Sequence, residues 1–225
     1  MNIEPIAIIH SDFSSKFGIP RQSGLAEKLE ALIVFEAPYR VPEALRGIEG
    51  FSHLWLIWGF SGNDGKGWSP TVRPPRLGGD KRMGVFATRS PFRPNGLGLS
   101  CVRLTGVEQG PEGLMLRVAG ADLMDGTPIY DIKPYIAYTD SREASGQGFV
   151  QGQEWPLLEV RDPDHLLSVF PADKREALMQ VLAQDPRPAY QDRPERIYGF
   201  GFGAFDVRFR VEGNVLTVAQ LVRLE

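Results

Sequence analysis

The sequence predicts a mainly β fold: a closed or partly open β-barrel followed by a small α+β C-terminal domain. Short runs of apolar, β-branched and aromatic residues recur between residues 3 and 138, and turns rich in glycine and proline separate them. Few segments there have helical spacing, a combination typical of a barrel or a sandwich. Residues 140–155 are polar and rich in glycine, as in a linker. We therefore predict a barrel domain at residues 1–145 and a C-terminal domain at 150–225.

The first predicted domain consists almost entirely of strands. Residues 51–60, Phe-Ser-His-Leu-Trp-Leu-Ile-Trp-Gly-Phe, are rich in aromatic and branched side chains and predict a central strand. Pro42 near the start and Gly47 at the end of residues 41–47 predict one short helix. The predicted strands span residues 3–9, 32–37, 51–60, 82–88, 97–107, 114–121 and 129–138.

The second predicted domain combines two short helices with a β-hairpin. The helices begin at Asp162, an N-cap candidate followed by proline, and at Pro171. The alternation of glycine and phenylalanine at residues 199–203 lacks the strand-to-helix context of a phosphate loop, so we interpret it as strand and bulge. The hairpin consists of two alternating strands and a tight turn, at residues 204–211, 215–221 and 212–214.

The composition is that of an ordinary globular protein. The chain has 225 residues, of which 42% are hydrophobic and 24% are charged. Its single cysteine, Cys101, excludes an internal disulfide, and its three histidines show no metal-ligand spacing. The chain has no basic start followed by an apolar run and no stretch of membrane-spanning length. The sequence therefore predicts a cytoplasmic protein without a metal centre.

Charge is distributed unevenly along the chain. The net charge is −3, but residues 66–103 hold eight basic residues and one acidic residue, Asp80. Such a basic stripe is expected of a surface that binds a polyanion, and a solvated surface is the alternative. Trp68 in the same stretch is either a platform for stacking a base or a lid over the core. The basic residues are Lys66, Arg73, Arg76, Lys81, Arg82, Arg89, Arg93 and Arg103.

The loop within residues 84–100 is stiff and carries two arginines. Its two prolines fix φ and push the preceding residues toward extended conformations, and Asn95-Gly96 favours a turn. A stiff loop holds the guanidiniums of Arg89 and Arg93 in place, as recognition of a carboxylate or phosphate requires. A rigid hairpin loop with solvated charges is the alternative.

No catalytic motif stands out along the chain. It has no nucleophile–histidine–acid set, P-loop, zinc motif or nucleotide fingerprint, and His53 is more typical of a core or edge histidine than of a catalytic one. Polar residues instead gather in predicted loops, which suits the binding of a small polar ligand beside a basic face. These loop residues are Arg21, Gln22, Ser61, Gly62, Arg89, Arg93, Pro94, Asn95, Asp122, Asp125 and residues 185–190.

Seven segments of the chain form a set in a consistent order. They are Phe51-Ser-His-Leu-Trp55, Pro74-Pro-Arg-Leu-Gly-Gly79, Gly84-Val-Phe-Ala-Thr-Arg-Ser90, Phe92-Arg-Pro-Asn95, Asp125-Gly-Thr-Pro128, Asp131-Ile-Lys-Pro-Tyr135 and Asp185-Pro-Arg-Pro-Ala-Tyr190. This set resembles the signatures of the tRNA N6-threonylcarbamoyladenosine methyltransferase family. The resemblance implies a β-barrel methyltransferase that binds S-adenosylmethionine, works as a homodimer and methylates N6 of the modified adenosine beside the anticodon.

The resemblance, carried over by position, also implies a cofactor site. At Ser61-Gly62 relatives often carry a His-Gln pair, so a side-chain contact there would become a backbone contact in this chain. We expect Asp122 to bind ribose hydroxyls or the methionine ammonium group. The implied cofactor contacts are Arg21, Gln22, Ser61, Gly62, Arg89, Leu99, Gly120, Ala121, Asp122 and Leu123.

The chemistry of the implied reaction suggests roles for further residues. An acylated N6 is a poor nucleophile because its lone pair is delocalised, so a base that removes the N6 proton would help. We hypothesise that Asp125 or a neighbouring carboxylate is this base and that Tyr190 positions the adenine. We expect Arg187 to meet the threonyl carboxylate, and phosphate contacts from Arg73, Arg76, Lys81 and Arg82. The alternatives are a non-catalytic RNA-binding barrel and a methyltransferase for another adenosine or a small molecule.

Overall fold

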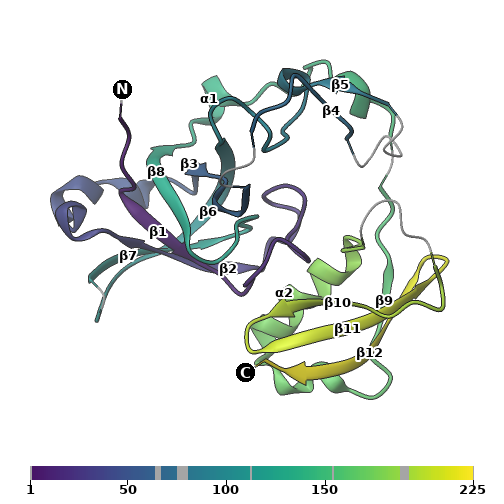
Figure 1. Cartoon of the computed structure of the whole chain (residues 1–225). Helices are drawn as coiled ribbons and strands as arrows, with labels where there is room; N and C mark the ends of the chain where they lie inside the picture. The colour runs from purple at the N-terminus through teal and green to yellow at the C-terminus, as the bar shows by residue number, and fades with distance from the viewer. Residues whose placement is uncertain are drawn as a thin grey trace.

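The computed structural model describes residues 2–63, 67–74, 81–111, 113–153, 155–187 and 193–224. Figure 1 shows two larger groups of strands and, apart from the C-terminal group, the short strands β4 (Thr71–Val72) and β5 (Met83–Gly84). Six N-terminal strands close into a ring, and four C-terminal strands form a sheet beside helix α2 (Ala172–Ala183). The predicted fold class, mainly β with a small α+β part at the C-terminus, is confirmed.

The ring is an antiparallel sheet closed by the pairing of β8 with β1. Each strand is hydrogen bonded to two neighbours in the order β1-β2-β7-β6-β3-β8. Side chains alternate between the interior and the outer face, so that Leu54, Leu56 and Trp58 of β3 are buried and the residues between them are partly exposed. The strands are β1 (Ala7–His10), β2 (Glu30–Phe35), β3 (His53–Gly59), β6 (Leu97–Gly110), β7 (Gly113–Ala119) and β8 (Thr127–Pro134).

One end of the ring receives most of the predicted site residues. Antiparallel pairing sets the ends of β1, β3 and β7 beside the starts of β2, β6 and β8, so that Ala119 lies opposite Glu30 and Gly59 lies opposite Leu97. Three loops therefore leave the ring at the same end, which we call the loop end. They are residues 11–29, 60–96 and 120–126.

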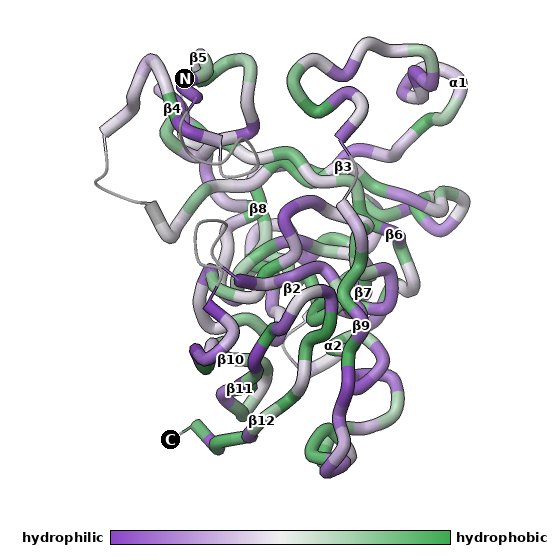
Figure 2. The backbone as a smooth tube through the Cα atoms, turned by 90° about the vertical axis from the view of Figure 1, so that its right-hand side faces the viewer, coloured by the Kyte–Doolittle hydropathy of each residue, from purple (hydrophilic) through white to green (hydrophobic). Residues whose placement is uncertain are grey.

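The strand predicted at 82–88 is wrong over most of its length. Only Met83–Gly84 (β5) is extended, paired with Thr71–Val72 (β4), and Val85–Ala87 forms a 3-10 helix. Side chains explain the change, because the hydroxyl of Thr88 and the guanidinium of Arg93 both donate to the Val85 carbonyl and compete with a strand partner. Figures 1 and 2 place β4 and β5 far from the C-terminal sheet.

Several other predicted elements differ from the structure at their ends. The strand predicted at 129–138 stops at Pro134 and is followed by helix α1 (Ala137–Asp140). The carboxylate of Asp140 causes the turn, because it accepts hydrogen bonds from the Ile136 backbone N–H and from Trp55 Nε1. Within the described ranges, the remaining short helices are 3-10 turns at Ala37–Tyr39, Pro42–Leu45, Ile48–Gly50, Ser61–Asn63, Gly148–Val150 and Leu166–Val169.

The C-terminal sheet has the strand order β10-β11-β12-β9, and the predicted hairpin is its centre. Glu212 pairs with Val215 across the tight turn, and glycine-rich β10 pairs with β11. The three-residue strand β9 pairs in parallel with β12 and was not predicted. The strands are β9 (Glu159–Arg161), β10 (Tyr198–Phe202), β11 (Phe205–Glu212) and β12 (Val215–Arg223).

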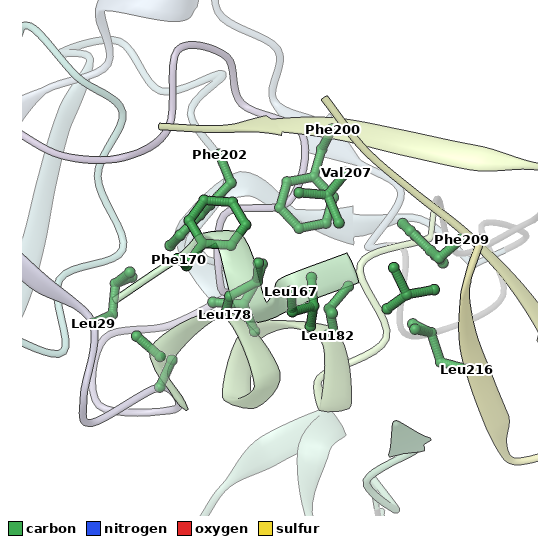
Figure 3. Close-up of a cluster of buried hydrophobic side chains, with 14 of the residues drawn as sticks. Leu29, Leu167, Phe170, Leu178, Leu182, Phe200, Phe202, Val207, Phe209 and Leu216 are labelled. Atoms are coloured by element: carbon green, nitrogen blue, oxygen red, sulfur yellow. The ribbon is translucent and has the colours of Figure 1, made fainter. Parts of the chain in front are cut away.

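The buried side chains form two hydrophobic clusters. One fills the ring, and the other lies between α2 and the C-terminal sheet. Figure 3 shows Leu29, from the loop at 11–29, in the second cluster with Phe170 and Leu178. Phe13 and Ala26 of the same loop also belong to that cluster. The first loop of the loop end is therefore packed by the C-terminal region. No helix of the described ranges is long and apolar enough to span a membrane.

Candidate functional site

Asp122 is the half-buried carboxylate at the loop end. It lies in the loop that follows β7. Its Oδ1 accepts a hydrogen bond of 2.6 Å from the hydroxyl of Ser100 on β6. Burial raises the pKa of Asp122 above its ordinary value, because loss of water disfavours the charged form. The Ser100 hydrogen bond and the positive charge of Arg89 oppose this rise. The site thus has an acidic group in partly dry surroundings, held by a serine on the ring and near a positive charge on a neighbouring loop.

Arg89 and Gln22 join two different loops beside this carboxylate. The guanidinium of Arg89, on the loop at 60–96, donates to the side-chain carbonyl of Gln22 on the loop at 11–29. Gln22 in turn donates to the backbone carbonyl of Arg21. A guanidinium and an amide that already lie side by side offer several donors to an anionic group of a ligand.

The backbone brings the first and third loops into contact. The Gly24 N–H donates to the Gly120 carbonyl at 2.9 Å, and both glycines have a φ of +80°, which other residues rarely adopt. A Cβ atom on Gly120 would lie 3.4 Å from the Gly24 backbone. The hydroxyl of Ser23 accepts a hydrogen bond from the Cys101 N–H at 3.1 Å. These contacts fix the loop of Gln22 against β6 and the end of β7.

Five other predicted cofactor contacts lie at the same end of the ring. Leu99 points outward from β6 and is 56% exposed, whereas the side chains of Ala121 and Leu123 are buried in the ring cluster. The latter two residues could therefore meet a ligand only through their backbone. Ser61 and Gly62 form a 3-10 turn, and a Cβ atom on Gly62 would lie 3.8 Å from Met124 Cε.

Of the two predicted catalytic residues, Asp125 and Tyr190, the structure describes Asp125, whose side-chain partners differ from those of Asp122. Asp125 Oδ1 accepts a hydrogen bond from the Ser11 N–H at 3.1 Å and lies 3.1 Å from His10 Nδ1. Its backbone N–H donates to the Phe13 carbonyl, so Asp125 fastens the third loop to the end of β1. Its side chain remains about half exposed. Tyr190 lies outside the described residues.

Arg21 and Arg187 meet where the first loop touches the C-terminal region. Arg21 Nη2 donates to the backbone carbonyls of Asp185 at 3.5 Å and Arg187 at 3.4 Å. The Arg187 guanidinium forms a bidentate pair with the Asp185 carboxylate, at 2.8 and 2.9 Å, and its side chain is only 12% exposed. Arg21 therefore faces the segment at 185–187, whereas Gln22 faces Arg89.

The basic residues of the second loop divide into two kinds. Arg73, Lys81 and Arg82 are exposed beside β4 and β5, where Arg82 Nη1 donates to the Thr71 hydroxyl at 2.9 Å. Arg93 instead donates to the carbonyls of Val85 and Thr88, at 3.3 and 2.8 Å, and stabilises its own turn. Of the two arginines of the stiff loop, Arg89 therefore reaches a neighbouring loop and Arg93 does not. Arg76 lies outside the described residues.

A cavity of about 420 Å³ lies between β1–β2 and helix α2, and neither Asp122 nor Arg89 lines it. Its lining carries paired charges, such as Asp12 with Lys174 and Lys28 with Glu176. Four acidic and four basic residues balance there, so the lining selects neither an anion nor a cation. The described ranges contain no group of three or more histidine, cysteine or acidic side chains that could bind a metal.

Sequence reasoning missed three residues of the site. Ser100 is a single polar residue among the inward positions of β6, and this break in the alternation was a usable signal. His10 and Ser23 gave no such signal, because their partners Asp125 and Cys101 are 115 and 78 residues away along the chain.

Comparisons with known proteins match both parts of the chain. The family model described as tRNA-methyltransferase O N-terminal domain matches residues 8–141, and the model described as TrmO C-terminal domain matches residues 167–224. A relative from Escherichia coli (strain K12), named tRNA (adenine(37)-N6)-methyltransferase, is 40% identical over 225 residues, covering 92% of this chain and 92% of that protein.

Two further similarities agree with these matches. A Pseudomonas aeruginosa relative whose name describes an S-adenosylmethionine-dependent methyltransferase is 40% identical over 215 residues, covering 92% of this chain and 91% of that protein. A crystal structure of TrmO from Pseudomonas aeruginosa has a TM-score of 0.80 and 33% identity, covering 99% of this chain and 98% of that chain. The similarity thus includes the ring, the C-terminal sheet and the connection between them.

Proposed function

Because the chain belongs to the tRNA-methyltransferase O family, we propose that it methylates N6 of the adenine at position 37 of tRNA, beside the anticodon, with S-adenosylmethionine as the methyl donor. The substrate form of this base is N6-threonylcarbamoyladenosine. The observation that carries the proposal is the family match over both parts of the chain. The convergence of Asp122, Arg89 and Gln22 at the loop end supports it.

The residues at the loop end fit the chemical groups of the methyl donor. S-adenosylmethionine supplies a methyl group activated by a sulfonium, and it also carries an ammonium group, a carboxylate and ribose hydroxyls. Asp122 is a carboxylate in partly dry surroundings and suits either the hydroxyls or the ammonium group. The side chains of Arg89 and Gln22 offer donors to a carboxylate. Gly120 has no side chain and lets the backbone of the first loop, at Gly24, pack closely against the third loop.

The transfer itself asks the protein mainly for alignment and exclusion of water. The acylated N6 must lose its proton, and we assign this role to Asp125, with Tyr190 positioning the adenine. Asp125 is half exposed, and its contacts with Ser11 and His10 would hold the carboxylate in one orientation. Asp125→Asn should abolish single-turnover methylation and leave donor binding intact. Full single-turnover activity in this variant would disprove the assignment.

The second loop supplies the surface for tRNA in this proposal. Arg73, Lys81 and Arg82 are exposed beside β4 and β5, and with Arg76 they would contact phosphates. Arg187 would meet the threonyl carboxylate, although its guanidinium already pairs with Asp185, so this contact requires a shared or exchanged partner. The remaining cofactor contacts are those of Arg21, Ser61, Gly62, Leu99, Ala121 and Leu123, the last two through backbone atoms.

We also propose a homodimer in the cytoplasm, built from a cofactor-binding domain at 1–145 and a C-terminal domain at 150–225. Leu97 and Leu99 are exposed beside the proposed site and give a second copy an apolar surface. Analytical ultracentrifugation of the protein and of Leu99→Asp tests this assembly. A monomer at micromolar concentration in the unsubstituted protein would contradict it.

The decisive experiment uses one tRNA in two forms, with and without the threonylcarbamoyl group on adenosine 37. Each is incubated with the protein and S-adenosylmethionine, and its nucleosides are analysed by mass spectrometry. A mass gain of one methyl group on threonylcarbamoyladenosine alone is the expected result. Calorimetry with S-adenosylhomocysteine should show binding at micromolar to sub-millimolar concentration. If the protein binds tRNA but neither methylates it nor binds the cofactor, it is a non-catalytic RNA-binding protein instead.

A further inference from the structure

Two polar side chains are almost completely buried within the described part of the chain. They are Ser100, which is 1% exposed, and Thr127, which is 2% exposed. The Thr127 hydroxyl donates to the Met124 carbonyl at 2.7 Å and closes a local turn. Ser100 lies on β6 and connects two other side chains, so it calls for a different explanation.

Ser100 is the middle member of a hydrogen-bond chain with a fixed direction. Trp58 Nε1 donates to Ser100 Oγ at 2.9 Å, and Ser100 Oγ donates to Asp122 Oδ1 at 2.6 Å. The indole N–H is a donor only, so the serine oxygen must accept from Trp58. The single serine proton is then left for Asp122. This hydrogen bond to Oδ1 stabilises the charged form of Asp122, the carboxylate.

Trp58, the first donor of this hydrogen-bond chain, is held rigidly inside the ring of strands. The ring of Phe60 packs on Trp58 with centroids 4.4 Å apart. Gly98 lies directly beneath the indole, and a Cβ atom there would overlap the Trp58 ring. Trp58 is therefore fixed before any ligand arrives, and its N–H points at Ser100. Such preorganisation lets the chain act on Asp122 without the cost of ordering side chains upon binding.

We propose that Ser100 and Trp58 are positioning residues that keep the Asp122 carboxylate charged and in one orientation for the bound methyl donor. This inference depends on the proposed function for its ligand, but the action on Asp122 itself belongs to the free protein. Among the described residues, the other groups that act on this carboxylate lie on loops: the backbone of Asp122 itself, Arg89 on the loop at 60–96, and the backbone of Ser23 on the loop at 11–29. Ser100 reaches Asp122 from a strand of the ring, β6.

The direction of the effect follows from the balance at Asp122. Burial raises its pKa, and the Ser100 hydrogen bond lowers it. Removal of the hydroxyl should raise the pKa further, so Asp122 takes up its proton at a higher pH. Donor binding needs the charged form, and it should then be lost at a higher pH than in the unsubstituted protein. When Trp58 no longer polarises the serine, the pH at which donor binding is lost should also rise, but by less.

The test is a pH titration of Asp122 in the ligand-free protein by carbon-13 NMR of labelled aspartate carboxyls, with Asp122→Asn to assign the resonance. Ser100→Ala should raise the titration midpoint by about one unit, a tenfold shift of the protonation equilibrium. Trp58→Phe should move it in the same direction by less. The matched control is Thr127→Val, which also loses a buried hydroxyl but should leave the midpoint unchanged.

Calorimetry with S-adenosylhomocysteine, which keeps the ribose hydroxyls and the ammonium group, completes the test. In Ser100→Ala the pH below which affinity falls should rise with the Asp122 midpoint, and in Thr127→Val it should not. An Asp122 midpoint that is the same in Ser100→Ala, Trp58→Phe and Thr127→Val would overturn the inference. Absence of S-adenosylhomocysteine binding by the unsubstituted protein would instead overturn the proposed function and leave the NMR result standing.

Discussion

The two hydrophobic clusters divide the first thirty residues of the chain between them. Ala7 and Ile9 of β1 belong to the ring cluster, whereas Phe13, only four residues after Ile9, belongs to the C-terminal cluster. Phe13 lies 5.6 Å from Phe202, ring centroid to centroid, in an edge-on arrangement. The loop at 11–29 therefore starts and ends on the ring but has its apolar anchors in the C-terminal region.

The three loops of the candidate site are held by two different regions of the molecule. The second and third loops are held by the ring, through β3, β6, β7 and β8, and they carry Arg89 and Asp122. The first loop carries Gln22 and takes its position from the C-terminal region, to which Arg21 is also hydrogen bonded. We infer that the C-terminal region contributes to cofactor binding indirectly, by holding Gln22 in place.

The largest effect on stability is expected from truncating a fully buried side chain in either hydrophobic cluster. Phe13→Ala and Ile9→Ala each empty a fully buried position and should destabilise the protein by about 3–5 and 2–5 kcal/mol, respectively. Amide hydrogen exchange should locate the damage, in β10, β11 and α2 for Phe13→Ala and in β1, β2 and β8 for Ile9→Ala. Equal loss of protection in both regions for both variants would show that the clusters unfold as one unit.

A smaller effect on stability is expected from substituting two glycines of the first loop. Gly18 and Gly24 have nearly the same φ, +84° and +80°, but a Cβ atom on Gly18 would overlap the Phe200 ring, whereas a Cβ atom on Gly24 would meet nothing within 4 Å. Gly24→Ala should cost about 1–2 kcal/mol for the left-handed backbone alone. Gly18→Ala should cost about 2–4 kcal/mol, because overpacking is added. Thermal unfolding measures both, and equal costs would mean that the loop does not press on the C-terminal cluster.

The sequence allowed prediction of elements whose signal is local. The strands of the ring follow from alternation or from apolar runs, and the hairpin from Phe205 to Arg223 follows from alternation around a glycine turn. The strand at 82–88 failed because side-chain hydrogen bonds from Thr88 and Arg93 decide the backbone there. The parallel strand β9 failed because three residues carry too little pattern.

The candidate site was predictable as a set of loops but not as a geometry. Convergence of the three loops depends on the strand order of the ring, which no local pattern reveals. Arg21 shows the same limit: the resemblance implied that it contacts the cofactor, but nothing in the sequence indicated its hydrogen bond to a segment 164 residues away. Likewise, Asp122 and Asp125 are three residues apart and contact different strands.

Arg21 gives a test of the contact between the first loop and the C-terminal region. Its two long hydrogen bonds should be worth about 0.5–1.5 kcal/mol in total, so Arg21→Ala should scarcely change the unfolding temperature. We expect the KM for tRNA to rise by about threefold to tenfold, because the segment at 185–187 loses its support. The affinity for S-adenosylhomocysteine should change less than in Gln22→Ala. A larger loss of cofactor affinity in Arg21→Ala than in Gln22→Ala would instead show that Arg21 is the more important cofactor contact of the two.

The smallest effect concerns the exposed cations of the two regions. Lys81 and Arg82 lie beside the β4–β5 pair of the N-terminal part, and Arg210 is an equally exposed cation on β11 of the C-terminal sheet. If the second loop contacts tRNA phosphates, Lys81→Ala or Arg82→Ala should each reduce the slope of log affinity against log salt by about 0.7–0.9. Arg210→Ala is the matched control and should leave the slope unchanged, since β4 and β5 lie far from the C-terminal sheet (Figures 1 and 2). Filter binding of the tRNA at several salt concentrations measures the slope, and an altered slope in Arg210→Ala alone would move the nucleic-acid surface to the C-terminal sheet.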